Sequence, residues 1–127
     1  MPLIRNHEDS RSEGISGAAI EVHRHLGPGL LESVYENALC HELALRGLDF
    51  MRQVAVLLNY KGCPIGEHRL DLLVADRVVV EIKAVERFDP VHEAPLPGYL
   101  RATGKHEGLL INFNTSLLKN GIKRKLL

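Results

Sequence analysis

The chain has 127 residues, of which 45% are hydrophobic and 25% are charged, and its formal net charge is zero. This length predicts one domain over residues 1–127 with a core of its own. Zero net charge excludes a general attraction to nucleic acid or to anionic membranes, so any phosphate-binding surface has to be a local patch.

The cysteine content and the polar N-terminus narrow the class of protein further. Cys40 and Cys63 make no CxxC pair, which argues against a disulfide framework and against a structural zinc site. No apolar run is long enough to span a membrane, and the charged N-terminus is unlike a signal peptide. We therefore expect a cytoplasmic protein with no membrane contact, in which residues 1–11 form a flexible N-terminal segment.

Two helices are predicted before the first strand. Ser10 followed by Glu13 is typical of a capping box, and apolar residues at helical spacing predict a first helix over about 12–26. Gly27-Pro28-Gly29 breaks it. A second helix is predicted from about Leu30 to Arg46, and Gly47 is a normal C-terminal cap.

Three strands are predicted next. Alternating apolar residues indicate a strand over 53–60, and residues 61–64 read as a turn. Two more strands, over 68–75 and 78–84, are joined by a turn at Asp76-Arg77. This arrangement is an antiparallel meander.

The remainder predicts a broken helix and a central strand. The helix over 89–103 contains Pro95 and Pro97, and an interior proline costs about 3 kcal/mol. We therefore expect a kink, or a restart with Pro97 in the first turn, and an end at Gly104. Residues 108–113 suit a buried strand, and the basic tail over 119–127 suits an edge strand. The order ααβββαβ predicts a mixed α/β or α+β fold with helices packed on the sheet.

Glu81-Ile82-Lys83 is the most informative stretch of the chain, because a strand places residues i and i+2 on one face. A carboxylate and an ammonium group side by side on an apolar strand are costly to bury unless they are paired or bound. With Asp71 close by, a divalent cation held by oxygen ligands is the natural partner. The alternative is a surface ion pair on a half-solvated sheet face.

The hairpin between Asp71 and Glu81 supplies a geometric test. If Asp76-Arg77 is a two-residue turn, Asp71 lies opposite Ile82 and faces away from Glu81. If the loop is Ala75-Asp76-Arg77, Asp71 lies directly opposite Glu81. A slip of one residue turns every side chain to the other face. A catalytic cation site shared by Asp71 and Glu81 therefore requires a loop with an odd number of residues, or a bulge.

Several short motifs occur in a fixed order along the chain. The run Gly29-Leu30-Leu31-Glu32-Ser33-Val34-Tyr35 resembles the defining motif of the GxxExxY family, which is placed in the PD-(D/E)XK nuclease-like superfamily. The similarity extends from about Ile15 onward, with further matching segments at 60–62, 69–74, 80–86, 108–114 and 121–124.

The resemblance implies a restriction-endonuclease-like core, in which a mixed central sheet is flanked by helices. It also implies an active site of Asp71, Glu81 and Lys83, with Glu32 as a helix-borne acid that completes the metal shell. We add the backbone carbonyl of Ile82 as a further metal ligand. One departure is Pro95, where relatives carry glutamine within a His-Glu-Ala-Gln pattern. Pro95 removes a polar side chain and a backbone donor, which predicts weaker activity or a differently held substrate.

Other residues have a structural and a functional interpretation. Glu36, one turn after Glu32, is expected on a solvated helix face, and Tyr35 in the core. Tyr99 either reaches the site and contacts nucleic acid or only packs. The basic residues near the C-terminus either contact phosphates or act as a solubilising tail, and they are Lys119, Lys123 and Arg124.

These observations favour a Mg²⁺- or Mn²⁺-dependent nuclease, with Asp71 and Glu81 as ligands and Lys83 assisting catalysis. We expect nucleic acid as substrate, with DNA favoured over RNA, and a homodimer or a protein partner is compatible with so small a domain. The alternative is a module on the same fold that binds nucleic acid or protein and has lost turnover.

Overall fold

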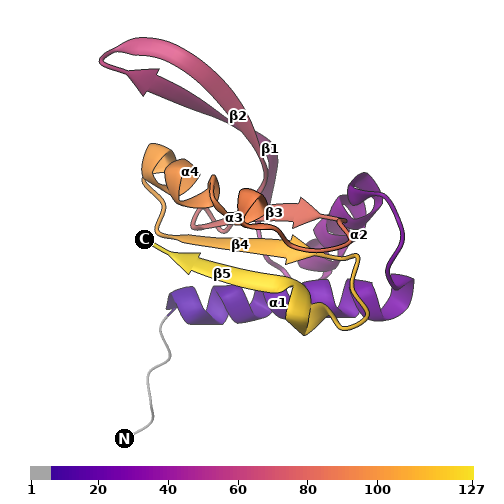
Figure 1. Cartoon of the computed structure of the whole chain (residues 1–127). Coiled ribbons are helices and arrows are strands. Elements are labelled where there is room, and N and C mark those ends of the chain that lie inside the picture. The colour runs from indigo at the N-terminus through magenta and orange to yellow at the C-terminus, as the bar shows by residue number, and fades with distance from the viewer. Residues whose placement is uncertain (1–6) are drawn as a thin grey trace, which may run out of the picture.

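The computed structural model describes residues 7–127, which form a five-stranded sheet with helices on both faces (Figure 1). The helices and strands follow the predicted order, with a short 3₁₀ helix between β4 and the last strand. They are α1 (His7–Leu26), α2 (Glu32–Leu45), β1 (Phe50–Tyr60), β2 (Cys63–Val74), β3 (Val78–Lys83), α3 (Pro90–Glu93), α4 (Leu96–Thr103), β4 (Glu107–Asn112), η1 (Leu118–Gly121) and β5 (Ile122–Leu126).

The strands lie in the sheet in chain order, β1-β2-β3-β4-β5. β1, β2 and β3 form the predicted antiparallel meander. β4 runs parallel to β3, because the helical segment α3–α4 carries the chain back across one face. β5 pairs antiparallel with β4 and is the predicted edge strand. The sheet is therefore mixed, as expected.

Each face of the sheet has its own apolar core. On one face α1 and α2 cover Leu72, Val80 and Ile111, and Tyr35 lies fully buried there with its ring stacked on Phe113 at 4.5 Å. On the other face Leu96 and Leu100 of α4 pack on the sheet. Both faces of β3 and β4 are thus buried, which explains their continuous apolar runs.

The hairpin of β1 and β2 extends beyond the rest of the sheet as a long two-stranded arm (Figure 1). Its turn is Lys61-Gly62, with φ angles of 49° and 82°. β2 begins at Cys63, before the predicted start at His68. Pro64 falls within the strand because the register shifts beside it, between Leu58 and Asn59, and a strand tolerates proline at such an irregularity.

The predicted break between α3 and α4 is confirmed. α3 ends at Glu93, α4 starts at Leu96, Pro97 lies in its first turn, and Gly104 ends it with a φ of 71°. The predicted start of the first helix is wrong. α1 begins at His7, so the position of Ser10 is inside the helix rather than at its cap. The predicted flexible segment is thus helical from residue 7, and its residues 1–6 lie outside the described residues.

Over residues 7–127, none of the helices combines the length and the apolar composition that crossing a membrane requires.

Candidate metal centre

The register of β2 and β3 satisfies the geometric test. Val74 pairs with Val78, and the next two pairs continue the same register. The loop is therefore Ala75-Asp76-Arg77, and it is closed by a 3.0 Å hydrogen bond from the Arg77 N–H to the Val74 carbonyl. In this register Asp71 lies opposite Glu81, as the catalytic hypothesis requires.

The two strands separate where this pair occurs. The β2–β3 ladder ends at Leu72 and Val80, and the Asp71 carboxylate takes the place of the next backbone acceptor. Its Oδ2 accepts the N–H of Ile82 at 2.7 Å. In a strand, the carbonyl of a residue points to the same edge as its N–H, so the Ile82 carbonyl also faces this fork. Asp71 and the Ile82 backbone are thereby brought together.

β2 bends at Asp71, and the cause lies in β1, at the residue Gln53 that faces Asp71 across the pair of strands. Arg52 pairs with Leu72 and Val54 pairs with Leu70, but Gln53 between them has no partner in the register and has a φ of 51°. A left-handed non-glycine residue inside a strand marks a local irregularity. The arm therefore leaves the sheet at Asp71, which opens one edge of β3 at Glu81.

Glu81 is only 7% exposed, and its surroundings disfavour a negative charge. The pKa of Glu81 is raised to about 8, chiefly by burial, and then by the negative charge of Asp71 and a hydrogen bond with that side chain. The positive charge of Lys83 opposes this rise only in part. Two carboxyl groups this close, in a place this dry, favour a bound cation because it neutralises both.

A histidine that we did not predict for the site also contacts Glu81. His68 Nε2 lies 3.1 Å from Glu81 Oε1, and the His68 ring is stacked on Tyr99 with 3.8 Å between centroids. Burial lowers the pKa of His68, which favours the neutral ring. The sequence signal was weak: His68 lies three residues before Asp71, and only the bend in β2 turns it toward β3.

A small cavity of about 100 Å³ opens in front of Glu81 and Lys83. Tyr99 lines it, so the structure brings this predicted contact residue to the site. Pro95 lines it as well. The departure from the glutamine pattern thus lies at the candidate site itself. The lining residues are His68, Glu81, Lys83, Val91, His92, Pro95, Leu96 and Tyr99.

The helix-borne acids behave differently from one another. Glu32 is exposed at the first residue of α2, and the side chains that the structure describes, those of residues 11–127, include no group of three His, Cys, Asp or Glu arranged to hold a metal. Its role as a ligand stays a prediction. The expectation for Glu36 is wrong, because Glu36 is buried and accepts hydrogen bonds from Arg52 at 2.7 Å and Gln53 at 3.0 Å. It joins α2 to β1.

The predicted basic cluster is largely engaged within the protein. Lys123 Nζ lies 2.7 Å from a Glu93 carboxylate oxygen, and Arg124 forms an ion pair with the buried Glu107. Lys119 lies in η1. These contacts reduce the positive charge that the C-terminal strand offers to a phosphate, and phosphate binding there stays a prediction.

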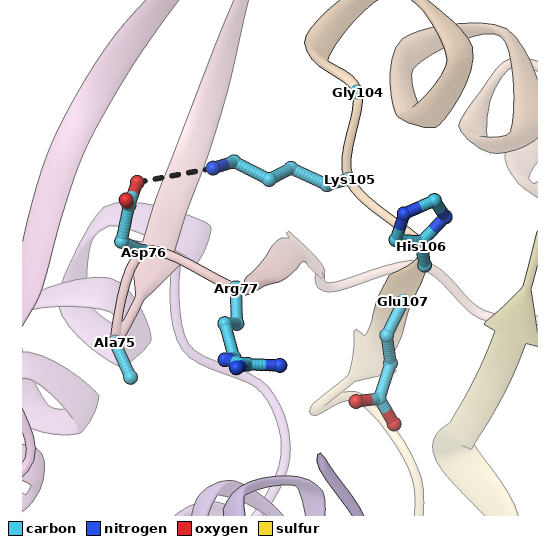
Figure 2. Close-up of a pocket in the computed structure, with 7 residues that line it drawn as sticks. All are labelled: Ala75, Asp76, Arg77, Gly104, Lys105, His106 and Glu107. Carbon is cyan, nitrogen blue, oxygen red and sulfur yellow. Dashed lines mark hydrogen bonds and ion pairs between the residues drawn. The ribbon is translucent and has the colours of Figure 1, made fainter.

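A larger cavity, of about 350 Å³, lies at the opposite end of β3 and β4 (Figure 2). It is lined by the β2–β3 loop and by Gly104 to Glu107, and Lys105 there pairs with Asp76 at 3.1 Å. Figure 2 shows His106 and Arg77 beside it. It offers no pair of adjoining carboxyl groups, so we assign the chemistry to the smaller cavity.

The donor set at Asp71 and Glu81 fits Mg²⁺ or Mn²⁺. It supplies two carboxylates and the Ile82 backbone carbonyl, all of which are hard oxygen ligands. Mg²⁺ is usually held by one or two carboxylates and keeps several waters, so two side-chain ligands are sufficient. Burial and the charge of Asp71 raise the pKa of Glu81, and the positive charge of Lys83 offsets this rise only in part, so a bound cation would stabilise the ionised pair further.

Comparison with known proteins gives one match. A family model described as the PD-(D/E)XK nuclease superfamily matches residues 9–125. A search of curated proteins found no matching sequence, and a search of solved structures found no matching structure. The matched range includes every residue of the fork between β2 and β3. The mixed sheet flanked by helices is consistent with a restriction-endonuclease-like core.

Proposed function

The chain belongs to the PD-(D/E)XK nuclease superfamily, and we propose that it is a metal-dependent nuclease that hydrolyses phosphodiester bonds in nucleic acid. The observation that carries this proposal is the juxtaposition of Asp71 and Glu81 at the fork. Asp71 accepts the Ile82 N–H next to Glu81, and the two carboxyl groups lie close enough for the negative charge of Asp71 to help raise the pKa of Glu81. Membership in the narrower GxxExxY family is part of the proposal, and it is supported by the motif at 29–35.

Each residue of the fork has a role in this proposal. Asp71, Glu81 and the Ile82 carbonyl hold Mg²⁺ or Mn²⁺, with Glu32 as a further ligand. A bound cation would lower the pKa of a water and stabilise charge on the scissile phosphate. Lys83 lies on the same strand face as Glu81 and lines the same cavity, where its ammonium group orients the attacking water or neutralises a phosphate oxygen. Tyr99, Lys119, Lys123 and Arg124 contact nucleic acid, with DNA favoured over RNA.

The experiment is a cleavage assay on supercoiled plasmid, single-stranded DNA and RNA, with Mg²⁺, Mn²⁺ or chelator. Wild type should cleave only with metal, and Glu81→Gln should be inactive while it remains folded. Glu86→Gln is the matched control, because Glu86 is an exposed glutamate close by on the chain. Cleavage by Glu81→Gln equal to that of wild type, or cleavage by wild type in chelator, contradicts the proposal.

A second candidate function is a binding module that has lost turnover, and the position of Pro95 favours it. Pro95 lines the site and has neither an amide side chain nor a backbone N–H to offer. Pro95→Gln should then raise cleavage above that of wild type. A module that binds nucleic acid, or a protein partner or second copy of this chain, would keep its affinity in chelator.

A further inference from the structure

His68 bridges the gap between two diverging strands. It lies on β2, beyond the last ladder pair with β3 at Leu72, and its Nε2 nevertheless reaches Glu81 Oε1 at 3.1 Å. No backbone ladder holds the two strands together at this point. This side-chain contact, together with the hydrogen bond from the Ile82 N–H to Asp71, therefore fixes the position of Glu81 relative to the arm.

Tyr99 fixes the His68 ring from the other side. The two rings are almost parallel, with an angle of 6° and 3.8 Å between centroids. Tyr99 belongs to α4, whose Leu96 and Leu100 are buried on the same sheet face. The ring of His68 is thereby held between a packed helix and the carboxyl group of Glu81, which restricts its rotamers.

We propose that His68 is a positioning residue, which donates its Nε2–H to Glu81 Oε1 and thereby presents Glu81 Oε2 to the cation. An ionised carboxylate only accepts hydrogen bonds, so Nε2 carries the proton when Glu81 acts as a ligand. A ligating carboxylate that is itself hydrogen-bonded is held in the orientation that the metal needs, and loss of such a partner costs about 10- to 100-fold in metal affinity or activity. This inference rests on the proposed function.

Two substitutions at His68 separate the hydrogen bond from the ring. His68→Phe keeps an aromatic ring for Tyr99 and removes the donor. His68→Gln removes the ring and keeps an N–H at a similar reach. The matched control is His106→Phe, the same substitution at an exposed histidine beside the cavity at the other end of the sheet (Figure 2).

The affinity for Mn²⁺ is measured by calorimetry on the full chain, together with the cleavage rate at saturating Mn²⁺ and the unfolding midpoint. His68→Phe should bind Mn²⁺ about 10- to 100-fold more weakly than wild type, while His68→Gln stays within a few-fold and His106→Phe is unchanged. If His68→Phe does not fold, Tyr99→Leu takes its place and should weaken Mn²⁺ binding by a smaller factor.

Wild-type affinity in His68→Phe overturns the inference and leaves the proposed function intact. Equal losses in His68→Phe and His68→Gln also overturn it, because the ring and not the N–H would then be responsible. If wild type itself binds no Mn²⁺, the proposed function fails, and the inference fails with it. The wild-type and variant measurements therefore distinguish the two failures.

Discussion

Replacing Glu81 by glutamine should stabilise the protein in chelator, although the same change should abolish cation binding. Burial of the Glu81 carboxyl group is the main reason that its pKa is raised from 4.5 to about 8. At a pH between 4.5 and about 8, Glu81 keeps its proton in the folded protein but has released it in the unfolded chain. Because the folded state binds more protons, the free energy of unfolding falls as the pH rises through this window. Glutamine carries no charge in either state and removes this dependence.

The size of the effect follows from the shift in pKa. One pKa unit corresponds to about 1.4 kcal/mol, so raising the pH from 5 to 8 should lower the free energy of unfolding of wild type by roughly 3 kcal/mol relative to Glu81→Gln. Most of the difference should appear above pH 6. At pH 5 the two proteins should differ little in this contribution, because Glu81 is then largely protonated in the folded state and partly protonated in the unfolded chain.

Urea unfolding at several pH values between 5 and 8, in chelator, measures the difference between the two proteins. Taking the difference cancels the histidines and other groups that titrate equally in both. Glu86→Gln, at an exposed position, should remain parallel to wild type throughout. If wild type and Glu81→Gln also remain parallel, Glu81 is already ionised in the folded protein, and our account of its desolvation is refuted.

Three further changes test separate parts of the site. Lys83→Met should lower the cleavage rate by about 100-fold or more, while the Mn²⁺ affinity measured by calorimetry changes only a few-fold. A comparable loss of cleavage rate and Mn²⁺ affinity would assign Lys83 to cation binding. Asp71→Asn should abolish Mn²⁺ binding but keep the fold, because the amide oxygen still accepts the Ile82 N–H; unfolding below the midpoint of Asp71→Ala would contradict this. Glu36→Leu should lower the free energy of unfolding by about 1–3 kcal/mol, because Glu36 accepts hydrogen bonds from Arg52 and Gln53. The same change should leave the affinity for Mn²⁺ unchanged. A loss of Mn²⁺ affinity without destabilisation would place Glu36 in the site instead.

The elements with strong local signals were predictable from the sequence. Pro95 and Pro97 predicted the break before α4, and the alternation of apolar residues predicted the antiparallel meander of β1, β2 and β3. The register that places Asp71 opposite Glu81 could also be defined from the sequence, because side-chain parity alone decides which face a strand residue occupies. That choice depended on a loop of three residues, Ala75 to Arg77, whose conformation the sequence left open.

Features that depend on long-range contacts were missed. The long β2 was not expected because Pro64 and Gly66 weaken a strand pattern, and the irregularity beside Asn59 that accommodates Pro64 is invisible without the partner strand. Glu36 was expected in solvent because its partner Arg52 lies on another element. His68 was overlooked for the same reason, since its contacts with Glu81 and Tyr99 come from β3 and α4.

The most direct test of the central claim is a calorimetric titration of Mn²⁺ into wild type and into Glu81→Gln at pH 8. We predict one Mn²⁺ bound by wild type, with proton release because Glu81 has a pKa of about 8, and no binding by the variant. Equal binding by both proteins, or none by wild type, would contradict the assignment of the fork between β2 and β3 as a metal centre.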